Sequence, residues 1–144
     1  MTNDTDRSPS DAVAHILDTY RIVAVVGLSP KPHRDSFEVA QYMQAQGWRI
    51  IPINPNAAAI LGEKAYPSLR EAAEHEHIGL VNVFRNSADV PPVVDDAIAI
   101  GATAIWLQLG INHEASAARA RQAGMMVVQD KCILVEHRRH SRGR

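Results

Sequence analysis

The chain has 144 residues, 46% of them hydrophobic, and a formal net charge of −1. A chain of this length and composition folds as one domain around a core of its own. Its charge provides no global basic field, which argues against nucleic acid or an anionic membrane as a partner. Cys132 is the only cysteine, so no internal disulfide can form, and no apolar run has the length of a membrane span. Because the polar, acidic N-terminus does not resemble a signal peptide, we expect a cytoplasmic protein.

Helices and strands alternate along the chain. After a leader that we expect to be flexible over residues 1–8, Ser8 and Pro9 predict the start of a first helix. Five apolar runs predict strands, in order Ile22–Val26, Ile50–Asn54, Leu80–Phe84, Ala104–Leu109 and Met126–Gln129. The helices predicted between them are Ser36–Gln46, a short helix opened by the capping box of Ser68 and Glu71, one starting near Pro91, and Glu114–Ala123. The glycines expected to end helices are Gly47, Gly101 and Gly124.

This alternation indicates the fold class. The apolar runs are too continuous for strands with one wet face, so they predict a parallel sheet covered by helices on both faces. With right-handed crossovers, this is a doubly wound, Rossmann-like α/β sheet of about five strands, in which we expect the first and fourth strands to be neighbours at the centre. One domain is predicted over residues 9–139, followed by a basic tail at 140–144. The charged stretch from His137 onwards is expected to be disordered.

The predicted sheet also indicates where a ligand would bind. In open α/β sheets, ligands bind beyond the carboxyl ends of the strands, at the point where the strand order reverses. The segments expected to border this crevice are Gly27–Ser36, Asn54-Pro55-Asn56, Phe84-Arg85-Asn86-Ser87, Gln108-Leu109-Gly110 and Asp130-Lys131-Cys132.

The loop after the first strand carries the strongest indication of a ligand. It leads from Gly27 to the start of a helix at Ser36, where unpaired backbone N–H groups and the helix dipole favour phosphate. Lys31, His33 and Arg34 add positive charge to the same loop. Alternatively, the loop is only a connection shaped by its glycine and prolines. The cations and the helix start favour the first interpretation, a site for a phosphorylated cofactor or nucleotide.

Two common phosphate-binding motifs are missing from this loop. The dinucleotide fingerprint has glycines where this chain has Ser29 and Pro32. The second predicted strand ends in Asn54 rather than in the acid that holds an adenine ribose, so we do not expect an ordinary nicotinamide site. No Gly-Lys-Ser/Thr follows the loop, so Walker-type binding is not predicted either.

The other strand ends each permit two interpretations. Asn54-Pro55-Asn56 is either an ordinary turn or a polar wall of the site. Arg85, next to Phe84, either contacts a phosphate or a base, or is a solvated arginine beside a helix cap at Ser87. Gln108 lies in an apolar strand and needs a hydrogen-bond partner, which is either the backbone of a neighbouring strand or, as we favour, the ligand.

Asp130, Cys132 and His137 permit an interpretation as an orienting acid, a nucleophile and its base. Their spacing fixes no geometry, and no oxyanion-hole motif accompanies them, so we assign no catalytic residue. The seven histidines do not have the spacing of zinc ligands, and no metal site is predicted.

Several stretches, taken together, resemble one known family. They are Val25–Ser29, the pattern Pro32-x-Arg34-x-Ser36, Ile53–Asn56, Tyr66–Leu69, Val83–Arg85, Val90-Pro91, Trp106–Ile111, Asp130–Cys132 and Glu136–Arg139. They cover most of the chain, from Asp11 to Arg139, in order and at compatible spacing. On these residues the chain resembles the small CoA-binding proteins, the stand-alone relatives of the N-terminal domain of the succinyl-CoA synthetase alpha subunit.

The resemblance implies a Rossmann-like domain that binds coenzyme A (CoA) or an acyl-CoA at the glycine loop and the strand ends. The phosphates would be held by Gly27, Ser29, Lys31, Arg34 and Ser36. The other residues that the resemblance places at the cofactor are Leu28, Asn54, Pro55, Asn56, Phe84, Arg85, Gln108 and Gly110. Leu28 departs from the family pattern, since many members have a small residue at that position.

The resemblance also bears on activity. The phosphohistidine of the synthetase lies in a later domain that this chain does not contain, which implies a sensor, carrier or regulator of acyl-CoA chemistry rather than a ligase. Two alternatives stay open. One is a Rossmann-type enzyme for nucleotide-dependent redox chemistry or for acyl transfer through Cys132 or His137, and the other is a module that recognises a partner in a CoA-dependent manner. The sequence does not distinguish free from acylated CoA, nor a monomer from a homo-oligomer.

Overall fold

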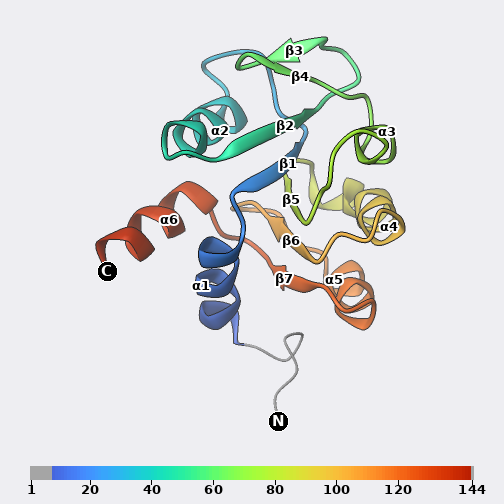
Figure 1. Ribbon diagram of the computed structural model, residues 1–144. Helices are drawn as coiled ribbons and strands as arrows, with labels where there is room; N and C mark the ends of the chain where they lie inside the picture. Colours follow the sequence, from blue (N-terminus) through green and yellow to red (C-terminus); the bar gives the residue numbers. More distant parts are fainter. Residues whose placement is uncertain (1–7, 144) are drawn as a thin grey trace.

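The computed structural model describes residues 8–143, and its centre is a parallel sheet (Figure 1). The expected flexible leader lies outside the described residues, apart from Ser8. Five strands form the sheet in the order β2-β1-β5-β6-β7, and every neighbouring pair is parallel. Their bounds are Ile22–Val26 for β1, Arg49–Ile53 for β2, Leu80–Val83 for β5, Ala104–Leu107 for β6 and Met126–Val128 for β7. The predicted Rossmann-like α/β class is confirmed.

One predicted strand pairing is wrong. We expected the first strand beside the fourth, but β1 lies between β2 and β5, the third strand of the sheet along the chain, with Ala24 opposite Val81. Both arrangements satisfy right-handed crossovers, so the sequence pattern alone does not separate them. In this protein the connection from β2 crosses over β1 to its other side. The strand order therefore reverses between β1 and β5, and the two segments that follow these strands emerge side by side.

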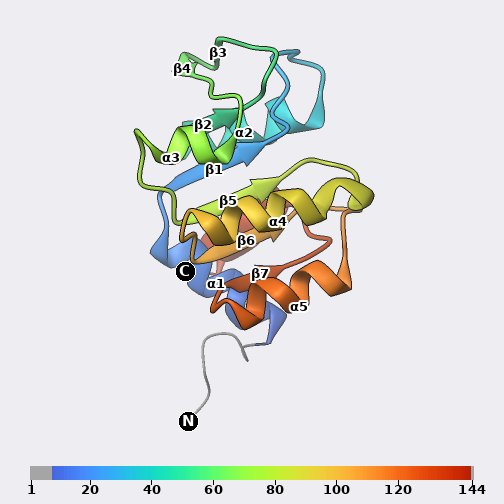
Figure 2. The ribbon, with the colours of Figure 1, turned by 90° about the vertical axis from the view of Figure 1, so that its right-hand side faces the viewer.

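Two layers of helices cover the sheet (Figures 1 and 2). On one face lie α1 (Pro9–Thr19), α2 (Asp35–Ala45) and α6 (Ile133–Arg142). On the other face lie α3 (Leu69–Ala73), α4 (Val90–Ala99), which a short 3₁₀ helix at Ser87–Asp89 precedes, and α5 (Glu114–Gln122). Alternate strand residues supply the two cores, since Val23 and Val25 pack under α1, α2 and α6 whereas Ala24 and Val26 face α3, α4 and α5.

Several helix ends lie where the sequence predicted them. The Ser8 Oγ accepts a hydrogen bond from the Asp11 N–H at 3.3 Å, and the Ser68 Oγ accepts one from the Glu71 N–H at 3.1 Å. These are the N-caps of α1 and α3, respectively. Gly47 follows α2 with a φ of +92°, the left-handed conformation that glycine adopts without strain.

A hairpin between β2 and α3 was not predicted. It consists of β3 (Ala59–Ile60) and β4 (Glu63–Lys64), joined by Leu61 and Gly62. Both turn residues have positive φ, 54° and 77°, as a two-residue hairpin turn requires. Leucine is uncommon in that conformation, so the sequence carries no ordinary turn signal at this point.

The expectation of a disordered stretch from His137 onwards is wrong, because α6 continues to Arg142. Two histidines attach this helix to the rest of the fold. The His137 Nδ1 lies 2.8 Å from the Tyr42 hydroxyl of α2, and the His140 Nε2 lies 2.8 Å from the Asp18 carboxylate of α1. The basic composition of this segment does not indicate a helix, because the contacts that hold the helix are made with residues far away in the sequence.

His137 makes stability depend on pH. Its burial lowers its pKa below the ordinary value of 6.5, and the positive charges of Arg21 and His140 act in the same direction. The unfolded chain then binds a proton that the folded chain does not, so the free energy of unfolding decreases as the pH falls from 6.5 through this lowered pKa. Urea unfolding of the protein and of His137→Gln across that range measures the effect.

We expect a flatter pH dependence in His137→Gln than in the parent protein. His77→Gln is the matched control, because His77 is an exposed histidine outside the helices. Equal pH dependence in the parent protein and His137→Gln would contradict the assignment.

Within residues 8–143, none of the helices combines the length and the apolar character needed to cross a lipid bilayer.

Candidate functional site

Three cavities lie at the carboxyl ends of the strands. The first, of about 350 Å³, lies between the ends of β1 and β2 and the start of α3. The second, of about 750 Å³, lies at the loop between β1 and α2. The third, of about 430 Å³, lies between α2, the ends of β5 and β6 and the start of α6. The cavities share lining residues. The first and second cavities share Gly27 and Ser29. The second and third cavities share Phe84 and Asn86, and the first and third share Arg85. We call this continuous hollow the carboxyl-edge groove.

Gly27 lies where the groove crosses the strand-order reversal. Its φ is +84°, and a Cβ at this position would lie 2.7 Å from the carbonyl oxygen of Phe84. Its own N–H donates to the Ile53 carbonyl at 3.1 Å. A glycine is therefore required by the close approach of two backbone segments of the protein itself, and it fixes the end of β1 against the end of β5.

Hydrogen bonds within the loop hold its shape. The Ser29 N–H donates to the Ser36 Oγ at 3.0 Å, and the Lys31 N–H donates to the Ser29 Oγ at 3.1 Å. Both serines line the second cavity, although Ser36 is buried. The side chain of Leu28 is fully buried in the core and lines none of the three cavities, so only its backbone lies near the predicted site.

The start of α2 opens onto the second cavity without a side-chain cap. Arg34 occupies the N-cap position and makes no capping hydrogen bond, as is also the case for the N-cap residues of α4 and α6, whereas N-cap side chains cap α1, α3 and α5. Lys31, His33 and Arg34 all line this cavity and are exposed. Asp35 is the acidic residue among the lining side chains. Free helix N–H groups beside three basic side chains can bind an anion such as phosphate.

Asn54 joins the second strand end to the loop. Its Nδ2 donates to the Leu28 carbonyl at 2.9 Å, and its Oδ1 accepts from the Asn56 N–H at 2.7 Å. Asn54, Pro55 and Asn56 all line the first cavity. The segment is therefore a turn stabilised by the asparagine side chain, and it borders the groove, where contact with a ligand stays a prediction.

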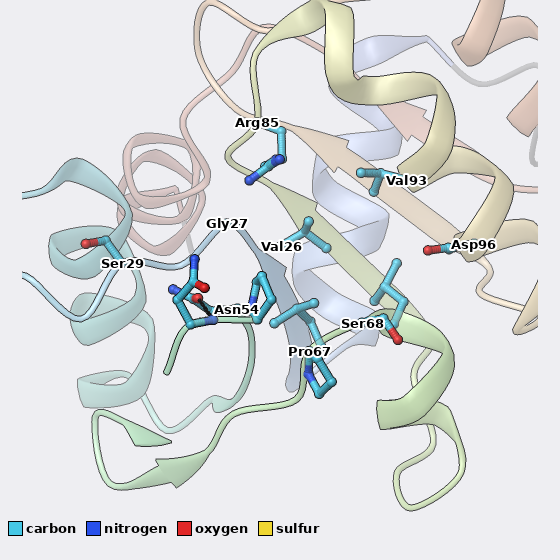
Figure 3. A pocket seen from close by; sticks show the side chains of 13 residues that line it. Val26, Gly27, Ser29, Asn54, Pro67, Ser68, Arg85, Val93 and Asp96 are labelled. Carbon is cyan, nitrogen blue, oxygen red and sulfur yellow. Dashed lines mark hydrogen bonds between the residues drawn. The ribbon is translucent and has the colours of Figure 1, made fainter. Parts of the chain in front are cut away.

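Arg85 lies between the first and third cavities and is exposed. Figure 3 shows its side chain on the strand-end side of the first cavity and Asp96 on the α4 side. Asp96 is paired with Arg70 at 2.7 Å, whereas no residue in 8–143 forms an ion pair with Arg85. The expected helix cap at Ser87 is wrong, since the Ser87 Oγ accepts from the Asn112 N–H at 3.1 Å and no side chain caps the 3₁₀ helix.

Gln108 has a backbone partner at the start of α6 rather than in a neighbouring strand. Its Oε1 accepts from the Ile133 N–H at 3.1 Å, so this side chain closes the start of α6. The residue is only 5% exposed and lines the third cavity. Its Nε2 has no hydrogen-bond partner among the described residues. The predicted site residue Gly110 lines none of the three cavities, and its N–H donates to the Asp130 Oδ1 at 2.6 Å.

Asp130, Cys132 and His137 are not assembled as a catalytic group. Cys132 lines the third cavity, but Asp130 is bonded to Gly110 and His137 to Tyr42. In the part of the chain that the structure describes, no group of three or more histidine, cysteine, aspartate or glutamate side chains is placed to hold a metal ion.

The structure also adds lining residues that the sequence reasoning did not assign. In the first cavity they are Val26, Ile53, Pro67, Ser68, Leu69, Val93 and Asp96. In the third cavity they are Glu38, Val39, Ile111 and Leu134. Several of them lie within helices, and no sequence signal links such residues to a strand end before the strand order is known.

An open parallel sheet with a groove at its strand-order reversal defines the class of Rossmann-like α/β proteins, in which ligands bind at this place. A family model described as a CoA binding domain matches residues 21–138. The chain belongs to this CoA binding domain family, which confirms the resemblance to small CoA-binding proteins and supports CoA as a partner in general.

The chain is also similar to several proteins of known sequence or structure. The uncharacterised protein YneT of Bacillus subtilis (strain 168) is 39% identical over 132 residues, which are 91% of this chain and 96% of YneT. A hypothetical protein from Pyrococcus horikoshii OT3 is 30% identical, with a TM-score of 0.87 over 98% of this chain and 97% of its own. The dinucleotide-forming acetyl-coenzyme A synthetase 1 of Ca. Korarchaeum cryptofilum shares the fold, with 24% identity and a TM-score of 0.65 over 74% of this chain and 25% of the synthetase.

Proposed function

We propose that this protein binds CoA or an acyl-CoA in the carboxyl-edge groove and acts as a sensor, carrier or regulator without catalysis of its own. The observation that carries the proposal is the uncapped start of α2, which lies in the groove beside Lys31 and Arg34. The binding unit would be residues 9–139, and the cytoplasmic location expected from the sequence is part of the same proposal.

The chemistry of the groove fits the parts of CoA. CoA carries a diphosphate and a ribose phosphate, and the second cavity offers basic side chains together with free helix N–H groups. The adenine fits the first cavity, where Pro55, Pro67 and the Arg85 side chain provide apolar surface and a planar cation. The pantetheine arm can then follow the groove past Phe84 into the third cavity.

The predicted phosphate-binding residues have different roles in this proposal. The backbone at the start of α2 donates N–H groups to phosphate oxygens, and Lys31 and Arg34 neutralise the charge. Ser29 and Ser36 hold the loop open through their hydrogen bond, and Asn54 ties the loop to the end of β2. Gly27 keeps the loop in register with β5 rather than contacting the ligand through a side chain.

Ligand-dependent thermal unfolding tests the proposal. Through linkage, a ligand at 100 times its dissociation constant stabilises the folded state by about 2.7 kcal/mol, which raises Tm by roughly 10 °C for a chain of this size. We expect CoA to produce a larger shift than NAD or ATP at the same concentration. Equal shifts from all three compounds, or none from CoA, would contradict CoA binding.

The absence of catalysis is tested separately. The purified protein is incubated with a large excess of acetyl-CoA, and the CoA released beyond one equivalent of protein is compared with that in Cys132→Ala. In acyl transfer through Cys132, its sulfur takes the acetyl group as CoA leaves as a thiol, and water then releases acetate and restores the cysteine. CoA release that disappears in the variant would favour this alternative, because Cys132 lines the third cavity.

A further inference from the structure

We propose that the third cavity receives the acyl group of a short, uncharged acyl-CoA, so that the thioester rather than free CoA is the preferred ligand. This inference rests on CoA binding in the carboxyl-edge groove and adds the class of acyl group. Three features of the cavity carry it: its continuity with the cation-lined second cavity, an amide donor that has no partner within the described residues, and the distribution of charge around it.

The third cavity adjoins the second cavity and meets the first at Arg85. It shares Asp35, Phe84 and Asn86 with the second cavity, so an arm that leaves the phosphates along the groove enters it directly. Beyond Phe84 the apolar lining residues are Val39, Leu109, Ile111 and Leu134. Leu109 is 68% exposed. An acyl chain would cover this apolar surface, whereas the thiol of free CoA would leave it in contact with water.

A donor without a partner lies in the same cavity. The Gln108 side chain is 95% buried and its Oε1 is occupied by the Ile133 N–H, so its orientation is fixed. This leaves the Nε2 group without an acceptor among residues 8–143 and free to donate into the cavity. It can donate to the carbonyl oxygen of a thioester, a group that free CoA does not carry on its sulfur. Cys132, the residue before Ile133, makes no side-chain capping hydrogen bond at the start of α6, so it does not compete with Gln108 there.

The charges around the cavity select among acyl groups. Asp35 and Glu38 reach it from the first turn of α2, and Arg85 is the basic residue of its lining. Two carboxylates against one guanidinium leave a net charge of −1. An acyl group that ends in a carboxylate, such as succinyl, is therefore repelled, whereas acetyl or butyryl is not.

Calorimetric titration of the intact protein with CoA, acetyl-CoA, butyryl-CoA and succinyl-CoA tests the inference. We expect butyryl-CoA to bind roughly tenfold more tightly than CoA, through one hydrogen bond and the added apolar contact. Succinyl-CoA is expected to bind roughly fivefold less tightly than butyryl-CoA. If CoA binds and butyryl-CoA binds no more tightly, this inference is wrong and CoA binding stands. If no CoA species binds, the proposed function fails with it.

Two substitutions examine the separate features. Glu38→Gln removes one carboxylate from an exposed helix position and should reduce the preference for butyryl-CoA over succinyl-CoA roughly fivefold. Glu71→Gln is the matched control, since Glu71 is an exposed glutamate in the first turn of α3 and lines none of the three cavities. Gln108→Glu keeps the acceptor for the Ile133 N–H but removes the free donor, so the ratio of butyryl-CoA to CoA affinity should fall. An unchanged preference in Glu38→Gln, or an equal change in Glu71→Gln, would overturn the charge argument.

Discussion

Replacing Gly27 by alanine is expected to destabilise the protein by about 3 kcal/mol or more, which lowers Tm by roughly 10 °C. Two costs add at this position. The φ of +84° is strained for any residue with a Cβ, and the new Cβ would lie 2.7 Å from the Phe84 carbonyl oxygen. Because that neighbour is backbone directly after β5, and its own N–H donates to the Val26 carbonyl at 2.9 Å, it cannot move without disturbing the β1–β5 pairing. Urea or thermal unfolding of Gly27→Ala measures the loss.

Gly47→Ala separates the two costs. Gly47 has a similar φ of +92°, but nothing lies within 4 Å of the position that its Cβ would take. This variant should lose only the conformational part, about 1 to 2 kcal/mol. Equal losses in the two variants would show that the approach of Phe84 to Gly27 does not contribute.

Loss of Lys31 and Arg34 together is expected to weaken CoA binding roughly 100-fold, with little change in stability. Hydrogen bonds to charged groups contribute about 1.5 to 3 kcal/mol each, and exposure of both side chains favours the lower value. Neither side chain forms an ion pair within the described residues, so their removal leaves no protein group unpaired. Calorimetric titration of Lys31→Ala/Arg34→Ala with CoA, together with its urea unfolding, checks both parts.

Arg121→Ala is the control for this pair. Arg121 is an exposed arginine in the last turn of α5 and lines none of the three cavities. It should leave CoA affinity unchanged. Wild-type affinity in the double variant would place the phosphates of CoA somewhere other than the start of α2.

Local signals in the sequence suffice for most elements of this fold. The caps Ser8 and Ser68 act on N–H groups three residues away, and Gly47 acts at its own φ, so each can be recognised without tertiary information. Strand order depends instead on how long connections cross the sheet, and the expected neighbours of β1 were wrong for that reason. Helix α6 escaped prediction because its anchoring partners, Tyr42 and Asp18, are distant in the sequence.

The residues of the candidate site also divide into those that local sequence signals indicate and those whose positions depend on the tertiary structure. Residues in loops directly after strands could be predicted, because parallel strands end at one edge, and the loop from Gly27 to Ser36 lies at the groove. Leu28 and Gly110 belong to such loops, yet one side chain points into the core and the other residue is turned towards Asp130. The partner of Gln108 lies 25 residues further along the chain, in a helix whose start the sequence did not indicate.

The position of Cys132 has a practical consequence. It is the only thiol in the chain, it is partly accessible, and it borders the third cavity. An alkylating reagent or a fluorescent maleimide therefore attaches at a single, known place without any engineering of the protein. The rate of labelling at Cys132 therefore reports whether a ligand occupies the third cavity.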